Sequence, residues 1–416
     1  MCKIYDRDFR LQTPGFRKQP AATTEQATWT SADEVYGSLF LRVLNYFTMT
    51  QDLLHSPLYE KQLALGARMG EVASWEMPLA YRGAVDEAGE VRSRAGVFDL
   101  TPLGRLRIRG DDSLKLLERL CSHDVARQQD DTIASTLLLN ERGGIIDLCH
   151  LVRLEDFWVL QTGAANGLKV LGILQQAAEG LAVKVDDQTA KTAMLGIAGP
   201  TAGGILEQFL PEKVSQLPLG SARLGSFMLA SYIVARVDFA GVWGLQVTLP
   251  NLFAGQAWRY ITEKAGANAL RPIGVWALDV LRVEAALPVY GHEINETIDP
   301  YTAGLDELVC LDHDFVGASA VKELSARPTA RLRAGLAVEL VGEVSFAPAI
   351  PRLGDAVLDA AGNEIGAITS ATFSPALDKV VAMAYLARSA DTQGALRIQG
   401  DGHQFQAKTV PLPFVS

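Results

Sequence analysis

The sequence predicts an α+β fold that ends in a small C-terminal β-barrel domain. Strand patterns that neighbour one another along the chain are joined by short turns, and helical patterns fall between such groups, which favours α+β over a doubly wound sheet. Beyond residue 332, short strands are separated by Gly, Pro and Asp at regular spacing. That spacing is typical of a small barrel or sandwich. The stretch 326–331 before it has the composition of a linker.

The first half of the chain contains a well-marked hairpin. Two strand patterns flank the turn Asn140-Glu-Arg-Gly-Gly144, whose residues favour a tight reversal. Helical spacing of apolar residues marks two helices around it. The predicted elements are, in order, a strand over 105–110, a helix over 114–120 capped by Asp111-Asp-Ser113, strands over 136–139, 145–154 and 157–162, and a helix over 166–180.

The middle of the chain carries a second strand–helix set over 192–267. Within it, residues 236–250 have the pattern of a strand, a glycine turn and a second strand, with Gly241 and Gly244 bracketing a tight loop. Such loops often bring backbone and a few side chains to a small ligand. A helix with a strong apolar face is predicted over 272–286, followed by short strands over 336–340, 365–369, 380–385 and 396–398.

Composition restricts the class of protein. The chain has 416 residues, of which 48% are hydrophobic, enough for two or three domains with real cores. A net charge of −10 argues against binding to nucleic acid or to a membrane surface. The four scattered cysteines form no metal-binding pattern, which indicates a reduced, cytoplasmic protein and no metal site. P-loop and dinucleotide fingerprints are absent from the sequence.

The first 48 residues differ from the rest. They lack the features of a secretory or transit signal, and the apolar run 37–48 is too short to span a bilayer. Met49 opens a segment with the composition of a natural start. We therefore interpret residues 1–48 as an upstream N-terminal extension. A chain starting at Met49 should fold; an insoluble truncation would contradict this.

Three charged residues are candidates for a functional site, although each has an ordinary structural explanation when taken alone. Asp124 follows a helix, where a carboxylate is usually a solvated turn residue. Asp147 interrupts an apolar strand, so it must be paired or lie at an edge. Arg282 lies on the helix predicted over 272–286, where a surface charge is the simple interpretation. No single one of them matches a motif.

Taken in order, a longer set of segments resembles the glycine cleavage T-protein family of folate-dependent aminomethyltransferases. The resemblance runs from residue 56 to the end of the chain. A Lys-Gly-Cys-x-x-Gly-Gln-Glu segment, which marks the family's relative that repairs iron–sulfur clusters, is missing. The matching segments include Ser56-Pro-Leu-Tyr-Glu60, Trp75-Glu-Met-Pro-Leu79, Arg94-Ala-Gly-Val-Phe-Asp99, His123-Asp-Val125, Leu139-Asn-Glu-Arg-Gly-Gly-Ile-Ile-Asp147, Leu281-Arg-Val-Glu-Ala-Ala-Leu-Pro-Val-Tyr-Gly-His-Glu293 and Val410-Pro-Leu-Pro-Phe414.

The resemblance implies a three-domain cloverleaf around a central hole that holds tetrahydrofolate. Residues 49–325 would form two α+β domains with the folate site, and 332–416 the barrel. The one-carbon donor would be an aminomethyl group on a lipoyl carrier protein.

The family's site residues carry over to matching positions in this chain. Asp124 would orient or deprotonate the folate amine, since the attacking nitrogen must lose a proton. Arg282 would orient that Asp or meet an anionic part of the ligand. The remaining residues expected to contact folate are Met77, Phe239, Trp243 and Gln246.

The chain departs from the family at the glycine loop. The family motif Tyr-Thr-Gly-Glu-x-Gly-x-Glu becomes Phe239-Ala-Gly-Val-Trp-Gly-Leu-Gln246. A carboxylate accepts two N–H bonds from the pterin edge, whereas the Gln246 amide offers one acceptor and one donor. Losing one such bond costs about 1–3 kcal/mol. Leu148 and Ala198 also replace polar residues of the family, and Trp243 either stacks on the ligand or fills vacated space.

Several functions remain open at this stage. The first is one-carbon transfer to tetrahydrofolate, aminomethyl or methyl, from a donor that the sequence does not fix. A tetrahydrofolate-dependent demethylase of a small N-, O- or S-methyl compound is the alternative within that chemistry. A folate-binding or regulatory protein without catalysis, or a relative that binds another planar ligand or a partner protein, would also fit the altered loop.

Overall fold

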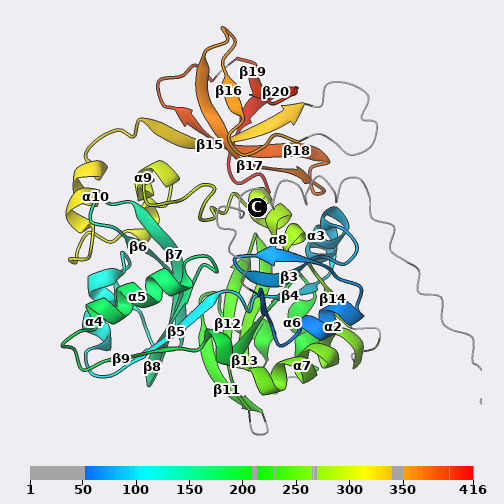
Figure 1. Ribbon diagram of the computed structural model, residues 1–416, viewed down its shortest axis with the longest axis vertical. Helices are drawn as coiled ribbons and strands as arrows, with labels where there is room; N and C mark the ends of the chain where they lie inside the picture. Colours follow the sequence, from blue (N-terminus) through cyan, green and yellow to red (C-terminus); the bar gives the residue numbers. More distant parts are fainter. Residues whose placement is uncertain are drawn as a thin grey trace, which may run out of the picture.

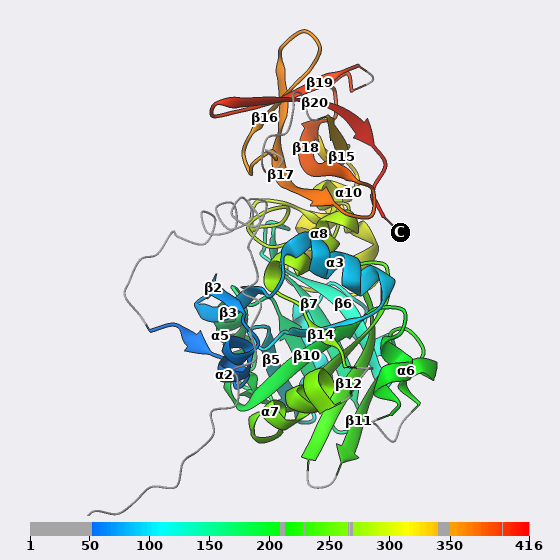
Figure 2. The same cartoon turned by 90° about the vertical axis from the view of Figure 1, so that its right-hand side faces the viewer.

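The computed structural model describes residues 52–208, 213–227, 230–264, 266, 269–339, 350–392 and 394–415. The predicted extension 1–48 lies outside these ranges. Three sheet-centred parts make up the described chain (Figure 1), and the barrel stands over the two other parts in both views (Figures 1 and 2). The α+β prediction is therefore confirmed, and so is the C-terminal barrel. No helix among the described residues is long and apolar enough to cross a membrane.

The first part is a five-stranded antiparallel sheet with two helices on its outer face. Leu116 and Leu117 of one helix and Val170 and Leu174 of the other are fully buried against the strands. The predicted 140–144 turn joins the first two strands as expected. The sheet order is β6 (Thr132–Leu139), β7 (Ile145–Leu154), β8 (Phe157–Thr162), β5 (Gly104–Arg109) and β9 (Lys184–Asp187), and the helices are α4 (Ser113–Leu120) and α5 (Gly167–Ala177).

The start of α4 differs from the expected cap. Asp112 occupies the N-cap position, but its side chain accepts no hydrogen bond from the helix. Its Oδ2 instead accepts from the backbone N–H of Ala182, at 2.7 Å. The carboxylate therefore ties the helix to the loop before β9.

The second part is a six-stranded sheet covered on its outer face by short helices. Its apolar outer side chains include Val97, Leu195, Leu245 and Trp258. The strand order is β11 (Ala222–Phe227), β12 (Ala230–Phe239), β13 (Val242–Pro250), β10 (Thr192–Ala198), β4 (Gly96–Asp99) and β14 (Arg271–Pro272), with helices α2 (Tyr59–Ala64), α6 (Ala202–Leu206) and α7 (Asn251–Arg259) and the π-helical turn Tyr260–Lys264. A small sheet precedes it, in the order β1 (Leu54–His55), β3 (Trp75–Ala80) and β2 (Arg68–Val72).

The two large sheets pack against each other through one apolar cluster. Val152 and Val159 of the five-stranded sheet meet Ala222 and Ala235 of the six-stranded sheet, all nearly inaccessible to solvent. A β-bridge between Thr132 and Ser221 joins their edges. We call the two surfaces that face each other here the inner faces. Any residue that shares a strand face with this cluster lies on an inner face.

The third part is a closed six-stranded barrel. The expected linker over 326–331 ends one residue early, because Arg331 already pairs with Ala387 in the barrel. The strand order is β15 (Arg331–Glu339), β18 (Lys379–Ala387), β17 (Glu364–Ser374), β16 (Ala356–Leu358), β19 (Leu396–Gly400) and β20 (His403–Val410). The connecting helices are α3 (Ala84–Ser93), α8 (Val275–Glu284), α9 (Pro300–Ala303) and α10 (Ala318–Ser325).

The helix predicted over 272–286 is shorter than expected. Arg271 and Pro272 form strand β14 beside β4, and α8 starts only at Val275. The backbone explains this start: Ile273 donates its N–H to Val97 O, and Gly274 donates to Glu87 Oε2 at 2.6 Å. These bonds hold the segment extended until the glycine, where a Cβ would lie 2.3 Å from Leu79 O.

The predicted glycine loop is a tight two-residue turn. Ala240 and Gly241, both at positive φ, connect β12 to β13, which suits a hairpin of this length. Asp238 Oδ1 accepts from the N–H of Gly241 at 2.7 Å. Gly244 does not bracket the loop as expected; it lies inside β13 and pairs with Val237.

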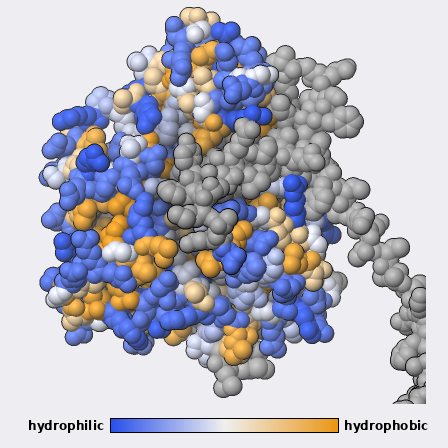
Figure 3. Space-filling view, in the orientation of Figure 1, coloured by the Kyte–Doolittle hydropathy of each residue, from blue (hydrophilic) through white to orange (hydrophobic). Residues whose placement is uncertain are grey.

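The surface in the orientation of Figure 1 mixes polar and apolar residues, and hydrophobic residues gather over α4 and α5 (Figure 3). Leu168, at the start of α5, is 83% exposed.

Candidate functional site

The inner face of the six-stranded sheet carries two of the residues predicted to bind a ligand. Gln246 pairs directly with Ala235 on one side and with Gly196 on the other, so all three share the inner face. Phe239 is on the same face because it lies four residues beyond Ala235 on β12. The strand pattern thus brings Phe239 and Gln246 together.

Gln246 is buried but not satisfied. Its side chain is 7% exposed, and its Oε1 has no hydrogen-bond partner among the described residues. Leaving a buried acceptor unpaired costs about 1–3 kcal/mol, so such atoms usually meet a ligand or water. The Oε1 atom is therefore available for a donor on a bound molecule.

Phe239 occupies space that two glycines leave open. Its ring stacks on Phe98 with centroids 5.3 Å apart. A Cβ on Gly244 would lie 2.7 Å from the Phe239 Cδ2, and one on Gly196 would lie 3.0 Å from its Cζ. The ring therefore lies flat over β13 and β10. Phe239 gives this part of the inner face an apolar aromatic surface.

Trp243 is separated from these residues. It lies three residues before Gln246 on β13, so its side chain points to the outer face, among the cluster that includes Leu245. The Arg236 guanidinium lies 4.8 Å from the Trp243 ring centre. A Cβ on Gly203 of α6 would lie 3.1 Å from its Cζ2. Of the two roles considered for Trp243, the packing favours space filling.

Asp124 lies at the edge of the five-stranded sheet. Residues 121–123 run antiparallel along β6: Cys121 bridges to Leu138, and the N–H of His123 donates to Thr136 Oγ1. Continuing this register places Asp124 beside Ser135. Its side chain is 20% exposed and accepts from the N–H of Arg127 at 3.2 Å, with the mostly exposed Arg127 guanidinium also at 3.2 Å. A solvent-facing partner leaves the carboxylate able to meet a ligand.

A polar row that sequence reasoning did not single out continues from Asp124 across the inner face. Ser135 pairs with His150, His150 with Gln161, and Gln161 with Arg105, each directly in register. Ser135 Oγ and His150 Nδ1 are 3.1 Å apart. Burial lowers the pKa of His150, which favours the neutral ring. The sequence did contain a signal, because His150 and Gln161 are polar residues in otherwise apolar strands.

Asp147 is structural in this arrangement. It lies on the outer face of β7, where it accepts from the N–H of Gly163 at 2.8 Å and from Asn166 Nδ2 at 3.1 Å. Burial raises the pKa of Asp147, against the lowering by Asn166 and the Gly163 N–H. The expectation that this carboxylate must be paired is confirmed.

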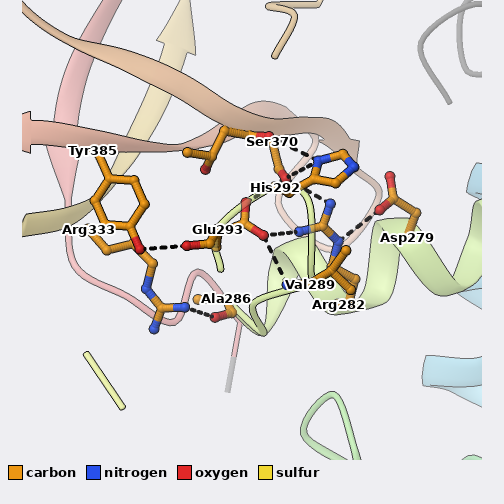
Figure 4. Close-up of polar contacts among 10 residues, drawn as sticks. Asp279, Arg282, Ala286, Val289, His292, Glu293, Arg333, Ser370 and Tyr385 are labelled. Carbon is orange, nitrogen blue, oxygen red and sulfur yellow. Dashed lines mark hydrogen bonds and ion pairs between the residues drawn. The ribbon is translucent and has the colours of Figure 1, made fainter. Parts of the chain in front are cut away.

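Arg282 belongs to a different network, between α8 and the barrel (Figure 4). Its Nη1 donates to Glu293 Oε2 at 2.9 Å, its Nη2 to Ser370 Oγ at 2.8 Å, and its Nε to Asp279 Oδ1 at 2.8 Å. Burial opposes the charge on Glu293, yet the Arg282 guanidinium and Ser370 outweigh it and lower the pKa of Glu293. The hydrogen bonds drawn in Figure 4 therefore connect Arg282 to the barrel residue Ser370, and Asp124 is not among their partners.

The same network borders open space. Arg282, Ser370 and His292 line a cavity of about 1080 Å³ between α8 and the barrel. His292 Nδ1 lies 3.1 Å from Thr369 O and 3.2 Å from Ser370 Oγ. Arg282 can thus present its cation to an anionic group in this cavity while Glu293 holds it in place.

Met77 is 1% exposed and lies on β3, on the same strand face as Leu79. Leu79 packs in the cluster that also contains Phe98 and, at its margin, Phe239. The structure brings Asp124, Gln246 and Phe239 to the region of the inner faces, whereas Trp243 points to the outer face and Met77 is buried on β3.

The residues present fit a planar heterocycle with N–H donors, such as the pterin of tetrahydrofolate. The Phe239 ring offers an apolar surface for such a ring, and the unpartnered Gln246 Oε1 is an acceptor for a donor on its edge. Asp124 supplies a carboxylate for an amine. No group of three or more His, Cys, Asp or Glu side chains able to hold a metal occurs in the described ranges.

Comparison with known proteins agrees with this arrangement. The family described as "GCVT N-terminal domain" matches residues 58–313, and "Glycine cleavage T-protein C-terminal barrel domain" matches residues 337–416.

Full-length relatives are similar over most of the chain. An aminomethyltransferase of Moorella thermoacetica is 33% identical over 366 residues, which is 87% of this chain and 98% of the relative. One from Desulfitobacterium hafniense (strain Y51) is 34% identical over 80% of this chain and 89% of its own length. The crystal structure of the glycine cleavage system aminomethyltransferase T from Bartonella henselae superposes with a TM-score of 0.78 at 28% identity, covering 87% of this chain and 98% of that one.

Proposed function

Because the chain belongs to the glycine cleavage T-protein family, we propose that it is an aminomethyltransferase that uses tetrahydrofolate as the one-carbon acceptor. The donor in this proposal is an aminomethyl group on the lipoyl arm of a carrier protein. The observation that carries the proposal is the collinear match to an aminomethyltransferase over 87% of the chain, and the buried, unpaired Gln246 Oε1 on the inner face supports it. Tetrahydrofolate supplies the amine nitrogens that take up the one-carbon unit, and ammonia leaves.

Asp124 acts on the folate amine in this proposal. A nitrogen that forms a bond to carbon must lose a proton, and a nearby carboxylate both accepts that proton and stabilises developing positive charge. Asp124 is suited to this because, among the residues that the structure describes, its Oδ atoms bond to the Arg127 N–H and to the Arg127 guanidinium, whose side chain is 78% exposed. Asp124 can exchange this partner for the amine at small cost, since exposed ion pairs contribute about 0–1 kcal/mol.

In this proposal, Gln246 and Arg282 bind and orient the ligand. Gln246 Oε1 accepts one N–H of the pterin edge, which lowers the cost of its burial. Arg282, fixed by Glu293 and Ser370, meets an anionic part of the ligand or of the donor in the cavity beside the barrel. Phe239 and Met77 provide the apolar walls.

Calorimetric titration with tetrahydrofolate tests the binding part of the proposal. Wild type should bind in the micromolar range or better, and Gln246→Glu should bind equally well or more tightly, because a carboxylate accepts two donors. Asp86→Ala, which removes an exposed acid of α3, is the control and should not change affinity. Absence of binding by wild type, with recovery in Gln246→Glu, would mean that the folate site has been lost.

Turnover with an aminomethyl-lipoyl carrier tests the chemistry. Asp124→Ala should lower kcat by about 10²–10⁴-fold, the usual contribution of a positioned acid or base. Turnover of Asp124→Ala equal to wild type would remove the residue from the mechanism. Turnover of a small N-, O- or S-methyl donor, but not of the carrier, would replace the proposal by the demethylase alternative.

A further inference from the structure

His292 lies in the loop between α8 and α9, where two cavities beside the barrel meet. It lines the cavity of about 1080 Å³ that Arg282 borders, and it also lines a second cavity of about 960 Å³ that reaches residues 327–331. The side chain is only partly buried. His292 therefore faces open space next to Arg282, and the proposed folate contacts do not use it.

The hydrogen bonds of His292 determine which ring nitrogen carries the proton. Nδ1 lies 3.1 Å from Thr369 O and 3.2 Å from Ser370 Oγ. The carbonyl oxygen can only accept, and Ser370 donates its one proton to Glu293 Oε1 at 2.6 Å. Nδ1 must therefore be the donor, so the neutral ring carries its proton on Nδ1 and a free lone pair on Nε2.

Nε2 is available to a ligand. It has no hydrogen-bond partner among the residues that the structure describes, and Figure 4 shows it turned away from the contacts that Nδ1 makes. Because Nδ1 is bound to barrel strand β17, the opposite edge of the ring is presented to the cavity. A neutral imidazole nitrogen with a lone pair accepts an N–H and offers no donor to an anion.

The charged groups around the larger cavity favour a cationic or N–H-bearing ligand. Carboxylates outnumber guanidinium groups in its lining, and the Arg282 guanidinium is already paired with two carboxylates. An excess of one sign of charge in a cavity concentrates ligands of the opposite sign. The lining carboxylates are those of Asp279, Asp355, Glu364 and Asp401, and the guanidinium groups are those of Arg282 and Arg352.

The aminomethyl donor has the group that this cavity suits. Its reacting carbon carries an amine, which offers N–H donors whether or not it is protonated and which leaves as ammonia. An S-methyl or O-methyl donor has no N–H at the reacting carbon. A single acceptor placed beside that carbon would therefore distinguish the two kinds of donor.

We propose that His292 Nε2 accepts a hydrogen bond from the amine of the aminomethyl donor, and from the ammonia that leaves, and so selects aminomethyl over methyl donors. This inference rests on the proposed function and assigns donor specificity within it to one residue. Arg282, which donates to the same Ser370 hydroxyl, meets the anionic sulfur that remains after transfer.

The reverse reaction tests the proposal, because it consumes ammonia, methylenetetrahydrofolate and the reduced lipoyl carrier as separate substrates. His292→Asn keeps an N–H for Thr369 O but has no acceptor at the position of Nε2. Its KM for ammonium should rise roughly 10- to 100-fold, the range for one lost hydrogen bond to a charged group. The KM values for the other two substrates and the melting temperature should stay as in wild type.

Two further variants complete the design. His292→Gln carries an amide oxygen that reaches toward the cavity, so it should recover part of the affinity for ammonium. His55→Leu removes an exposed histidine of β1 that pairs with Glu76, and it should change none of the three constants.

The outcomes separate the two proposals. If wild type catalyses the reverse reaction and His292→Asn has an unchanged KM for ammonium, the inference about His292 is overturned while the proposed function stands. An equal rise in all three KM values, or a lower melting temperature with no selective effect on ammonium, would also overturn it, because His292 would then be structural. A wild-type protein without aminomethyl transfer in either direction would overturn the proposed function, and the inference with it.

Discussion

Arg282 and Glu293 form a buried ion pair whose two members depend on each other. Glu293 is fully buried, and its carboxylate also accepts from Ser370 Oγ at 2.6 Å and from the N–H of Val289 at 3.1 Å. Removing one member of such a pair leaves an uncompensated charge in the interior, which is far more costly than losing the pair itself.

Arg282→Met should therefore lower the free energy of unfolding by about 3–5 kcal/mol. Asp279→Ala, which removes a more exposed partner of the same guanidinium, should cost no more than about 1 kcal/mol. The measurement is urea denaturation at pH 7. The double variant Arg282→Met/Glu293→Gln should recover part of the loss. A single Arg282→Met as stable as wild type would contradict the buried pair.

His150 predicts a pH dependence of stability. Burial lowers the pKa of its ring below the ordinary value of 6.5. As the pH falls through 6.5, the unfolded chain binds a proton that the folded chain does not, so the folded state loses stability. At pH 8 both states are neutral and this group contributes nothing.

The free energy of unfolding should therefore fall between pH 7.5 and 5.5, and the fall should be smaller in His150→Gln. One titrating group changes stability by at most about 1.4 kcal/mol per pH unit. Denaturation at pH 7.5, 6.5 and 5.5 measures both slopes. His123, whose pKa burial also lowers, remains in the variant and keeps part of the slope. Equal slopes in the two proteins would show that His150 titrates normally when folded.

At the scale of elements, the β12–β13 hairpin requires a glycine at position 244, because a side chain there would collide with Phe239. Phe239 lies over β13, and a Cβ on Gly244 would approach its Cβ to 3.1 Å and its Cδ2 to 2.7 Å. The ring cannot move freely because it also stacks on Phe98. Gly244 is therefore required by packing and not by a left-handed backbone.

Gly244→Ala should destabilise the protein by about 1–3 kcal/mol, the usual cost of overpacking. Gly204→Ala in α6 is the matched control: nothing lies within 4 Å of its added Cβ, and alanine favours helix, so stability should stay equal or rise. Thermal unfolding of the two variants measures the contrast. If both changes had the same effect, Phe239 would not occupy the space above Gly244.

The sequence predicted the presence of helices and strands better than the residues at which they begin and end. The 140–144 hairpin and the barrel strands were predictable because turn residues and alternating apolar positions are local signals. The start of α8 was wrong because the bonds that delay it come from Val97 and Glu87, both distant in sequence. For Trp243 the sequence leaves stacking on a ligand and filling of space both open, and alternation along β13, which points it away from Gln246, favours the second.

At the scale of the whole molecule, Glu284 of α8 links three separate segments. Its carboxylate accepts from Arg92 Nε of α3 at 2.6 Å and from Ser374 Oγ of β17 at 2.5 Å, and its carbonyl accepts from the N–H of Val415. The side chain is fully buried. One residue of α8 therefore holds together α3, barrel strand β17 and the C-terminal segment.

Glu284→Ala should loosen all of these contacts together. It leaves the Arg92 guanidinium, 15% exposed, without its carboxylate, and should cost about 3–5 kcal/mol. Hydrogen exchange should rise in both α3 and β17. Asp86→Ala breaks an exposed pair of α3 and should cost about 0–1 kcal/mol with no change in the barrel. Faster exchange in one of the two elements alone would show that Glu284 does not couple them.

The sequence by itself determined the α+β class, the main hairpins, the C-terminal barrel and the family, because these follow from local periodicity, turn chemistry and ordered motifs. It also predicts Asp124 and Gln246 as site residues. Only the tertiary structure decided which strand faces meet. That packing places His150 and Gln161 on the inner face opposite Gln246, and it commits Arg282 to Glu293 and the barrel. The reason is physical: alternation fixes the side of a strand on which a residue lies, whereas its partners depend on contacts between segments far apart in the chain.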